Sequence, residues 1–205
     1  MDAFALRQGE RVLLLGASGS GKSTLLNLIC GVVAPQSGRI EVQGTDLGAL
    51  AGAARDRFRA TRFGILFQMF NLLPYLTALD NVLLPLGFAP ERRARAGDGP
   101  GEARRLLERL GVGEVADEPA ASLSVGQQQR VAAARAMIGA PPIVVADEPT
   151  SALDTDTQDA FLALLFAELD RTAASLVMVS HDRSLAPRFD RVVPLADIAT
   201  TSRPA

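Results

Sequence analysis

The segment Gly16-Ala17-Ser18-Gly19-Ser20-Gly21-Lys22-Ser23-Thr24 constrains the local fold more tightly than any other part of the sequence. It fits the phosphate-loop pattern G-x-x-x-x-G-K-[ST], with an apolar run before it and helical apolar spacing after it. Glycines let backbone N–H groups converge on phosphate oxygens, and the N-terminus of the following helix adds a favourable dipole. We therefore predict that this loop binds nucleotide phosphates, with Lys22 reaching the β- and γ-phosphates and Ser23 ligating Mg²⁺. The alternative is a flexible Gly/Ser turn with an exposed lysine.

Apolar runs without alternation recur at 11–15, 143–146 and 175–179, and helical stretches separate them. Parallel strands that are covered on both faces have this pattern. The sequence thus predicts an α/β fold, a parallel-sheet core with helices on both faces. Further strands are expected at 39–42 and 63–67, and helices at 23–33, 51–62, 78–86, 102–110, 124–136 and 157–170. Pro85 is expected to end or kink its helix.

The stretch 90–101 is rich in Arg, Gly and Pro, which predicts a mobile surface loop. Its arginines Arg92, Arg93 and Arg95 are expected to form a solvated face. Contact with a phosphate or an acidic partner is the alternative.

Composition excludes several classes of protein. The chain has 205 residues, 48% of them hydrophobic and 21% charged, which is ordinary for one globular domain. A net charge of −2 gives no basic field that would favour nucleic acid as a partner. The single cysteine, Cys30, cannot form an internal disulfide and lies in an apolar stretch, so we expect it to be buried. No apolar run approaches the roughly 20 residues of a membrane-spanning helix, and no secretory signal opens the sequence. We expect a cytosolic protein that reaches a membrane only through another chain.

Two acidic residues, Asp147 and Glu148, directly follow the apolar strand at 143–146. Strand ends of this kind hold carboxylates next to a bound metal ion and its attacking water. Asp147 fits a metal-associated aspartate. Glu148 fits a general base, a role worth about 10²–10⁴-fold in rate. A surface acidic turn before Pro149 is the alternative.

A further motif is the run Leu123-Ser124-Val125-Gly126-Gln127-Gln128-Gln129-Arg130. Ser124 is a natural N-cap, and the amide groups of the helix that it starts can point at an anion. An ordinary capped helix would have the same pattern.

These motifs, in this order along most of the chain, resemble the nucleotide-binding subunit of ATP-binding cassette transporters. The resemblance implies a P-loop NTPase fold in a single domain, 1–205, with a helical subdomain at about 70–140 and a small antiparallel β portion that is shortened at the N-terminus. It also implies ATP and Mg²⁺ as cofactors. Only 15 residues precede Gly16, so we expect this sequence to lack the extra strand and the adenine-stacking aromatic that relatives usually carry, unless the sequence starts late. Phe4 falls at a core position instead.

The resemblance also implies roles for individual residues. Gln68 would contact Mg²⁺ and the attacking water, and His181 would be the switch histidine that contacts the γ-phosphate. The run Ser151-Ala152-Leu153-Asp154 would cross a dimer interface. Ser124, Val125, Gly126 and Gln127 would approach the γ-phosphate of ATP bound to a partner subunit. Val125 departs from the glycine that is commonest there.

The residues after Gln68, at 67–74 and 76–82, resemble lipoprotein-releasing and macrolide-export type subunits. In the wider family this stretch meets the membrane subunit, so Met69, Phe70, Leu72 and Leu73 are candidates for an interface. The alternative is that they belong to the core.

Taken together, the resemblance implies an ATP hydrolase that dimerises head to tail, sandwiches two ATP molecules and drives an integral membrane subunit on a separate chain. Its place would be the cytoplasmic face of the inner membrane, and its work export, lipoprotein release or mechanical work on the envelope. One alternative is a nucleotide-gated scaffold or regulator of a division-type complex, with low turnover. Another is a cassette that acts on DNA or ribosomes, although such relatives usually carry paired cassettes or long insertions.

Overall fold

The computed structural model describes residues 4–17 and 19–198. Its main sheet has five parallel strands in the order β4-β5-β6-β1-β7. Their bounds are β1 Arg11–Leu15, β4 Phe63–Leu66, β5 Ile143–Asp147, β6 Ser175–Ser180 and β7 Arg191–Pro194. A second, antiparallel sheet pairs β2 Glu41–Val42 with β3 Thr45–Asp46. The predicted parallel core and small antiparallel portion are confirmed, whereas β7 was not predicted.

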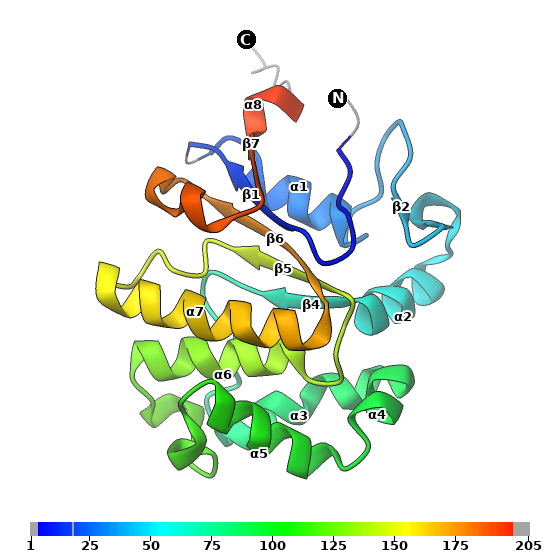
Figure 1. Ribbon diagram of the computed structural model, residues 1–205. Coiled ribbons are helices and arrows are strands. Elements are labelled where there is room, and N and C mark those ends of the chain that lie inside the picture. The colour runs from blue at the N-terminus through cyan, green and yellow to red at the C-terminus, as the bar shows by residue number, and fades with distance from the viewer. Residues whose placement is uncertain (1–3, 18, 199–205) are drawn as a thin grey trace.

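Helices cover both faces of the parallel sheet (Figure 1). Helix α1 lies on one side, α6 and α7 lie on the other, and α3, α4 and α5 lie beyond α6 (Figure 1). The helices are α1 Lys22–Ile29, α2 Gly52–Arg62, α3 Ala78–Phe88, α4 Pro90–Ala96, α5 Gly99–Arg109, α6 Val125–Met137, α7 Thr155–Thr172 and α8 Leu195–Ile198. Short 3₁₀ turns occupy η1 Leu47–Ala49, η2 Gly113–Val115, η3 Ala120–Ser122 and η4 Arg183–Arg188. No helix within the described ranges is long and apolar enough to cross a membrane.

The strands are continuously apolar because both of their faces are buried. Successive strand residues point to opposite faces. Val12 and Leu14 pack in the cluster under α1, whereas Leu13 packs in the cluster with α6 and α7. Cys30 is buried in the α1 cluster, as predicted, and burial raises the pKa of its thiol to about 12. Phe4 is half-buried against the same cluster, which agrees with its expected core position.

Helix α3 continues beyond Pro85 to Phe88, so of the two expected outcomes, an end or a kink, Pro85 does not end the helix. A proline removes one backbone donor from a helix. Val82 and Leu86, on either side of it, are buried in the core. Burial of this face outweighs the lost hydrogen bond.

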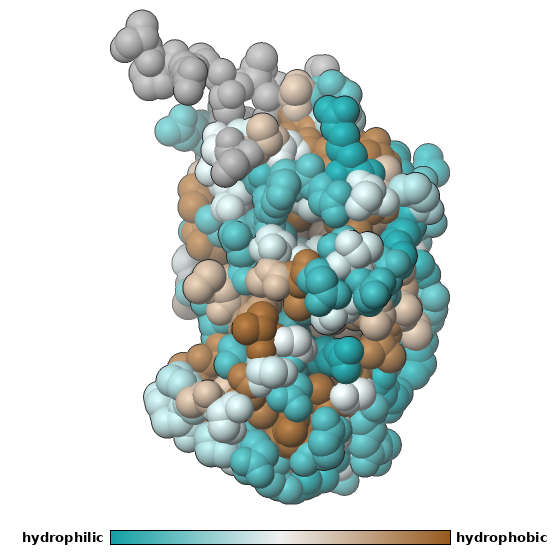
Figure 2. Space-filling view, turned by 90° about the vertical axis from the view of Figure 1, so that its left-hand side faces the viewer, coloured by the Kyte–Doolittle hydropathy of each residue, from teal (hydrophilic) through white to brown (hydrophobic). Residues whose placement is uncertain are grey.

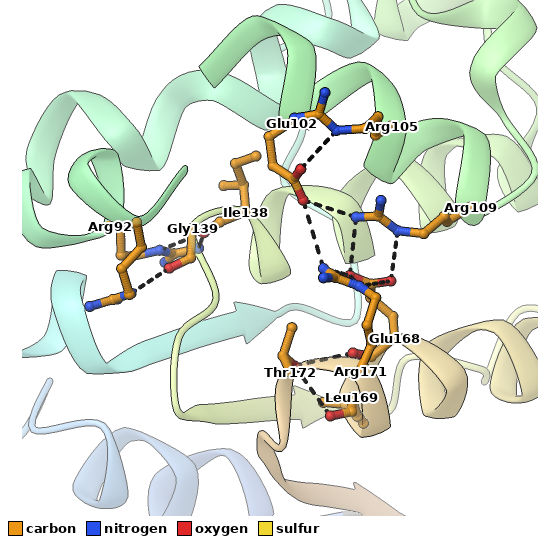
Figure 3. Close-up of polar contacts among 11 residues, drawn as sticks. Arg92, Glu102, Arg105, Arg109, Ile138, Gly139, Glu168, Leu169, Arg171 and Thr172 are labelled. Carbon is orange, nitrogen blue, oxygen red and sulfur yellow. Dashed lines mark hydrogen bonds and ion pairs between the residues drawn. The ribbon is translucent and has the colours of Figure 1, made fainter. Parts of the chain in front are cut away.

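The predicted mobile loop at 90–101 is also wrong, because this stretch forms α4 and the start of α5. Arg92 is only 2% exposed. Its guanidinium donates to the carbonyl oxygens of Ala136 (2.9 Å), Phe63 (3.2 Å) and Ile138, the last of which Figure 3 shows. Nε of Arg95 donates to the carbonyl of Gly139 at 2.8 Å. These two arginines satisfy carbonyls at the end of α6 instead of forming a solvated face.

An ion network joins α5 to α7 (Figure 3). Glu168 on α7 is buried, and it accepts hydrogen bonds from Arg109 (2.9 Å) and Arg171 (3.0 Å). Arg109 also donates to Glu102 at 2.9 Å. The buried carboxylate therefore has charged donors from two helices, which is the condition under which a buried charge is tolerated.

Candidate functional site

The carboxyl ends of β1, β5 and β6 meet at one edge of the sheet, on the left in Figure 1. Leu15 pairs with Ser180, and Asp147 pairs with Val179, so these strands end at nearly the same level. The residues that follow the strands are the phosphate loop, Glu148 and His181, and they emerge together. Ligands of open parallel sheets bind at this edge.

The phosphate loop lies directly between β1 and α1. Gly21, with a left-handed φ of 91°, is the N-cap of α1 and turns the chain into the helix. Lys22 is 7% exposed, and its Nζ donates to the carbonyl oxygens of Gly16 (2.8 Å) and Ala17 (2.9 Å). The hydroxyl of Ser20 is buried and has no hydrogen-bond partner within the described ranges, so it is a donor suited to an anion. The loop thus places a buried hydroxyl donor and the Lys22 ammonium at the start of α1. Ser18, a predicted phosphate-binding residue, lies outside the described residues, whereas Gly19 and Thr24 lie within the loop and the first turn of α1.

A hydroxyl and a carboxylate come together at the start of α1. Oγ of Ser23 donates to Oδ2 of Asp147 at 2.7 Å. Mg²⁺ in nucleotide sites takes oxygen ligands from one or two side chains together with phosphate oxygens. The chemistry of this pair fits such an ion.

Glu148 lies at the centre of a charged cluster. It is 9% exposed, and its Oε1 lies 3.0 Å from Nζ of Lys22. Its Oε2 contacts Nδ1 of His181, whose side chain is 60% exposed. The backbone of Glu148 has a positive φ of 44°, held by a 3.0 Å hydrogen bond from its N–H to the carbonyl of Val179. Because Glu148 is buried and held on both sides, the alternative of a surface acidic turn is wrong.

Gln68 follows β4, the strand next to β5. Leu66 of β4 pairs with Ala146 of β5. Gln68 and Glu148 each lie two residues beyond this pair. The Gln68 side chain is exposed and makes no hydrogen bond to any other described residue. The structure therefore places Gln68 at the correct sheet edge but does not join it to the Lys22–Glu148 cluster.

The four apolar residues that follow Gln68 divide between core and surface. Phe70 is buried in the core, and Leu72 packs against it. Met69 is 80% exposed. Leu73 is half-buried, and its N–H donates to Oδ1 of Asn81 at 2.8 Å. The core alternative is thus correct for Phe70 and Leu72, and Met69 stays a candidate for an interface.

The predicted helix cap at Ser124 is confirmed. Oγ of Ser124 accepts from the Gln127 N–H at 3.3 Å, and the Ser124 N–H donates to Oε1 of Gln127 at 3.0 Å, which completes a capping box. Val125 is half exposed beside them, and Gly126 follows in the first turn. Further along α6, buried Gln129 donates to the carbonyl of Pro149, the residue after Glu148. No sequence pattern indicated this contact, because it joins residues from separate elements.

The run from Ser151 to Asp154 leads from Glu148 into α7. Ser151 and Ala152 are exposed, and Leu153 packs against the core. Asp154 caps α7 by accepting from the Thr157 N–H at 2.9 Å. Hydrogen bonds from the backbone and side chain of Thr157 lower the pKa of the Asp154 carboxyl.

A family model and several individual proteins match this chain in sequence. A family model described as ABC transporter matches residues 2–151. The lipoprotein-releasing system ATP-binding protein LolD of Anaeromyxobacter dehalogenans is 47% identical over 190 residues, which cover 92% of this chain and 78% of LolD. The macrolide export ATP-binding/permease protein MacB of Rhodopirellula baltica is 42% identical over 193 residues, 94% of this chain and 28% of MacB. The predicted resemblance to the lipoprotein-releasing and macrolide-export type is confirmed.

A solved structure matches as well. The ATP-binding cassette MJ0796, in a dimeric post-hydrolysis state bound to ADP and Pi, superposes with a TM-score of 0.78 at 37% identity. The match covers 93% of this chain and 83% of MJ0796. The predicted P-loop NTPase fold is thereby confirmed. The chain belongs to the ABC transporter family, as one of its ATP-hydrolysing cassettes.

Proposed function

We propose that this cassette closes as a head-to-tail dimer around two ATP molecules with Mg²⁺, and that hydrolysis opens the dimer again. The observation that carries the proposal is the cluster of Lys22, Glu148 and His181 at the sheet edge, with Ser23 and Asp147 beside it. One buried carboxylate lies between a phosphate-binding lysine and an exposed histidine. This arrangement suits attack of water on a phosphate held in the loop.

Each residue of the cluster has a separate task. The loop amides and Lys22 bind the β- and γ-phosphates, so Nζ of Lys22 exchanges its loop carbonyls for phosphate oxygens. Ser23 and Asp147 would hold Mg²⁺, which neutralises phosphate charge when bound. Oε1 or Oε2 of Glu148 accepts a proton from the attacking water, and His181 orients that carboxylate and contacts the γ-phosphate. We assign Gln68 to the same water and metal from the adjacent strand.

The second half of each site comes from the other subunit in this proposal. Ser124, Val125, Gly126 and Gln127 would reach the γ-phosphate on the partner, and the run from Ser151 to Asp154 would cross the interface. Figure 2 views the side of the molecule where the strands end, and over the described residues it mixes hydrophilic and hydrophobic groups instead of forming one broad apolar patch. A mixed surface suits an interface that opens and closes, since permanent interfaces are more apolar.

We propose that the residues at about 70–140 form a helical subdomain of the single domain 1–205, and that a membrane subunit docks beside it. A groove of about 460 Å³ lies between β4, α2 and α3. Its lining combines apolar side chains (Phe63, Phe67, Pro85, Phe88) with charged ones (Asp56, Arg59, Arg92, Arg135). Phe88 is 74% exposed. A groove with exposed aromatic side chains and charged groups beside them fits an amphipathic helix of a membrane chain. The cassette would then lie at the cytoplasmic face of the inner membrane.

The work driven would be export, lipoprotein release or mechanical work on the envelope. LolD is named for a lipoprotein-releasing system and MacB for macrolide export. The identity to both supports this class of work. Substrate selection would reside in the membrane chain.

The Glu148→Gln variant tests the proposal. It removes the general base while keeping the shape of the side chain, so turnover should fall about 10²–10⁴-fold. ATP with Mg²⁺ should then hold the variant as a stable dimer, measured by light scattering during gel filtration. Glu114→Gln is the matched control, because it makes the same change at an exposed residue outside the proposed site. Undiminished hydrolysis by Glu148→Gln, or a monomer in ATP, would contradict the mechanism.

A further inference from the structure

The chain takes a strained path just beyond Gln68. Phe70 and Asn71 are consecutive residues with left-handed φ values of 57° and 51°. Glycine adopts this conformation freely and asparagine tolerates it, whereas phenylalanine does so at a cost. Backbone of this kind persists only where the surrounding structure holds it.

Arg135 on α6 holds this backbone. One terminal nitrogen of its guanidinium donates to the carbonyl oxygen of Asn71 at 2.5 Å, and the other donates to the carbonyl of Phe70. These are the only hydrogen bonds of the Arg135 side chain among the described residues. Burial lowers the pKa of this guanidinium, which has carbonyl oxygens in place of a carboxylate as its acceptors. A rigid two-pronged donor fits two successive carbonyls, which a single ammonium group does not.

The far end of the same segment is held from α3. Asn81 is fully buried, and its Nδ2 donates to the carbonyls of Leu73 and Thr77, each at 3.0 Å. The backbone at 70–77 is therefore fixed by one side chain from α6 and one from α3. Gln68 lies immediately before this fixed stretch.

We propose that Arg135 is a positioning residue for Gln68. By holding Phe70 and Asn71 in the left-handed conformation, it sets where the Gln68 side chain lies relative to Ser23 and Asp147. The inference rests on the role proposed above for Gln68. Ser124 caps the other end of α6. Arg135 therefore links the backbone after Gln68, which belongs to one site, to the helix whose cap would serve the other site.

The test compares Arg135→Lys with the native chain. Lysine keeps the charge but cannot donate to both carbonyls in the same geometry. We expect turnover to fall about 10–100-fold, the effect of a misplacement near 1 Å. The Mg²⁺ concentration for half-maximal turnover should rise, while ATP binding without Mg²⁺ stays unchanged. A merely structural role would lower the amount of folded protein and leave the Mg²⁺ requirement as it is.

Arg95→Lys is the matched control. Arg95 also donates to backbone carbonyls, those of Gly139 (2.8 Å), just after α6, and of Thr61 (3.3 Å) in α2. It does not contact the segment after Gln68. Its turnover and Mg²⁺ requirement should match those of the native chain, and a response equal to that of Arg135→Lys would overturn the inference.

Gln68→Ala and the double variant separate this inference from the proposed function. If the inference holds, Gln68→Ala lowers turnover and Arg135→Lys adds little in its background. If Gln68→Ala lowers turnover but Arg135→Lys behaves as native, or adds its full effect, the inference is overturned and the role of Gln68 stands. If Gln68→Ala leaves turnover unchanged, the role of Gln68 fails and the inference falls with it.

A second variant covers the case in which Arg135→Lys does not fold. Asn71→Ala is an exposed change that makes the φ of 51° less favourable and leaves the core intact. We expect a smaller rise in the Mg²⁺ requirement in the same direction. An unchanged requirement would count against Arg135 acting through this backbone.

Discussion

Gly64 in β4 lies so close to α6 that a single added carbon should destabilise the fold. A Cβ at this position would lie 2.1 Å from the carbonyl oxygen of Ala136 and 3.0 Å from Cγ of Pro141. Since real Cβ atoms keep at least 3.0 Å from such neighbours, the strand and the helix end would have to separate by 0.9 Å, the difference between 2.1 and 3.0 Å. The same Ala136 carbonyl accepts a 2.9 Å hydrogen bond from buried Arg92.

The expected cost of Gly64→Ala has two parts. Overpacking a closely packed contact costs about 1–3 kcal/mol. Weakening a hydrogen bond to a charged group adds about 1.5–3 kcal/mol. We therefore expect the free energy of unfolding to fall by about 3 kcal/mol or more, which lowers the melting temperature by at least about 6 °C for a chain of this size.

The assay is equilibrium unfolding in urea, followed by circular dichroism, with thermal melts alongside. Gly87→Ala is the matched control, because a Cβ at Gly87 in α3 meets no atom within 4 Å. Alanine is the better helix former by about 0.5–1 kcal/mol, so this control should be as stable as the native chain or slightly more stable. If Gly64→Ala lies within about 1 kcal/mol of Gly87→Ala, well below the expected total of about 3 kcal/mol, the reasoning on the contact between β4 and α6 is refuted.

Two further predictions concern Ser124, the cap of α6, and Glu10 in the N-terminal segment. Ser124→Arg should abolish hydrolysis and leave ATP binding to the monomer intact, measured by phosphate release and by fluorescence titration; loss of monomer binding would mean that Ser124 acts within its own chain. A hydrogen bond from Arg191 holds the pKa of the Glu10 carboxyl below its usual value of 4.5, against a smaller opposing effect of burial. The folded state therefore favours the ionised form, so the stability that Glu10 contributes is complete above pH 4.5 and is lost as the pH falls through the lowered pKa. Between pH 6 and pH 3, the free energy of unfolding in urea should fall less steeply with pH in Glu10→Gln than in the native chain. An equal slope in both would contradict the assignment.

Much of the fold could be predicted because its causes are local. The apolar run at 143–146 forms β5, and the Ser124 and Gln127 pair forms a capping box, as the spacing of these residues indicates. Asp147 ends β5 and Glu148 follows it, at the edge to which parallel strands bring their carboxyl ends. The roles assigned to the phosphate loop, Gln68, Ser124, Asp147, Glu148 and His181 in binding and catalysis stay predictions.

The failures involve contacts between distant parts of the chain. Composition indicated a loop at 90–101, but Arg92 is buried because its acceptors, such as the carbonyl of Ile138, come from residues far along the sequence. A single sequence does not show that pairing. The strand β7 was missed for a similar reason, because it is only four residues long and depends on pairing with β1.

The Ser124 hydroxyl illustrates why a helix cap can also serve chemistry. Its oxygen accepts the Gln127 N–H with a lone pair, and its hydrogen remains available to a different acceptor. An incoming phosphate could therefore take that hydrogen without uncapping α6. Aspartate would cap the helix equally well but would bring a negative charge against the phosphate, and asparagine would substitute an amide for the compact hydroxyl. Among the good capping residues, only serine and threonine can cap the helix and also donate a hydrogen bond to an anion from a small, neutral hydroxyl group.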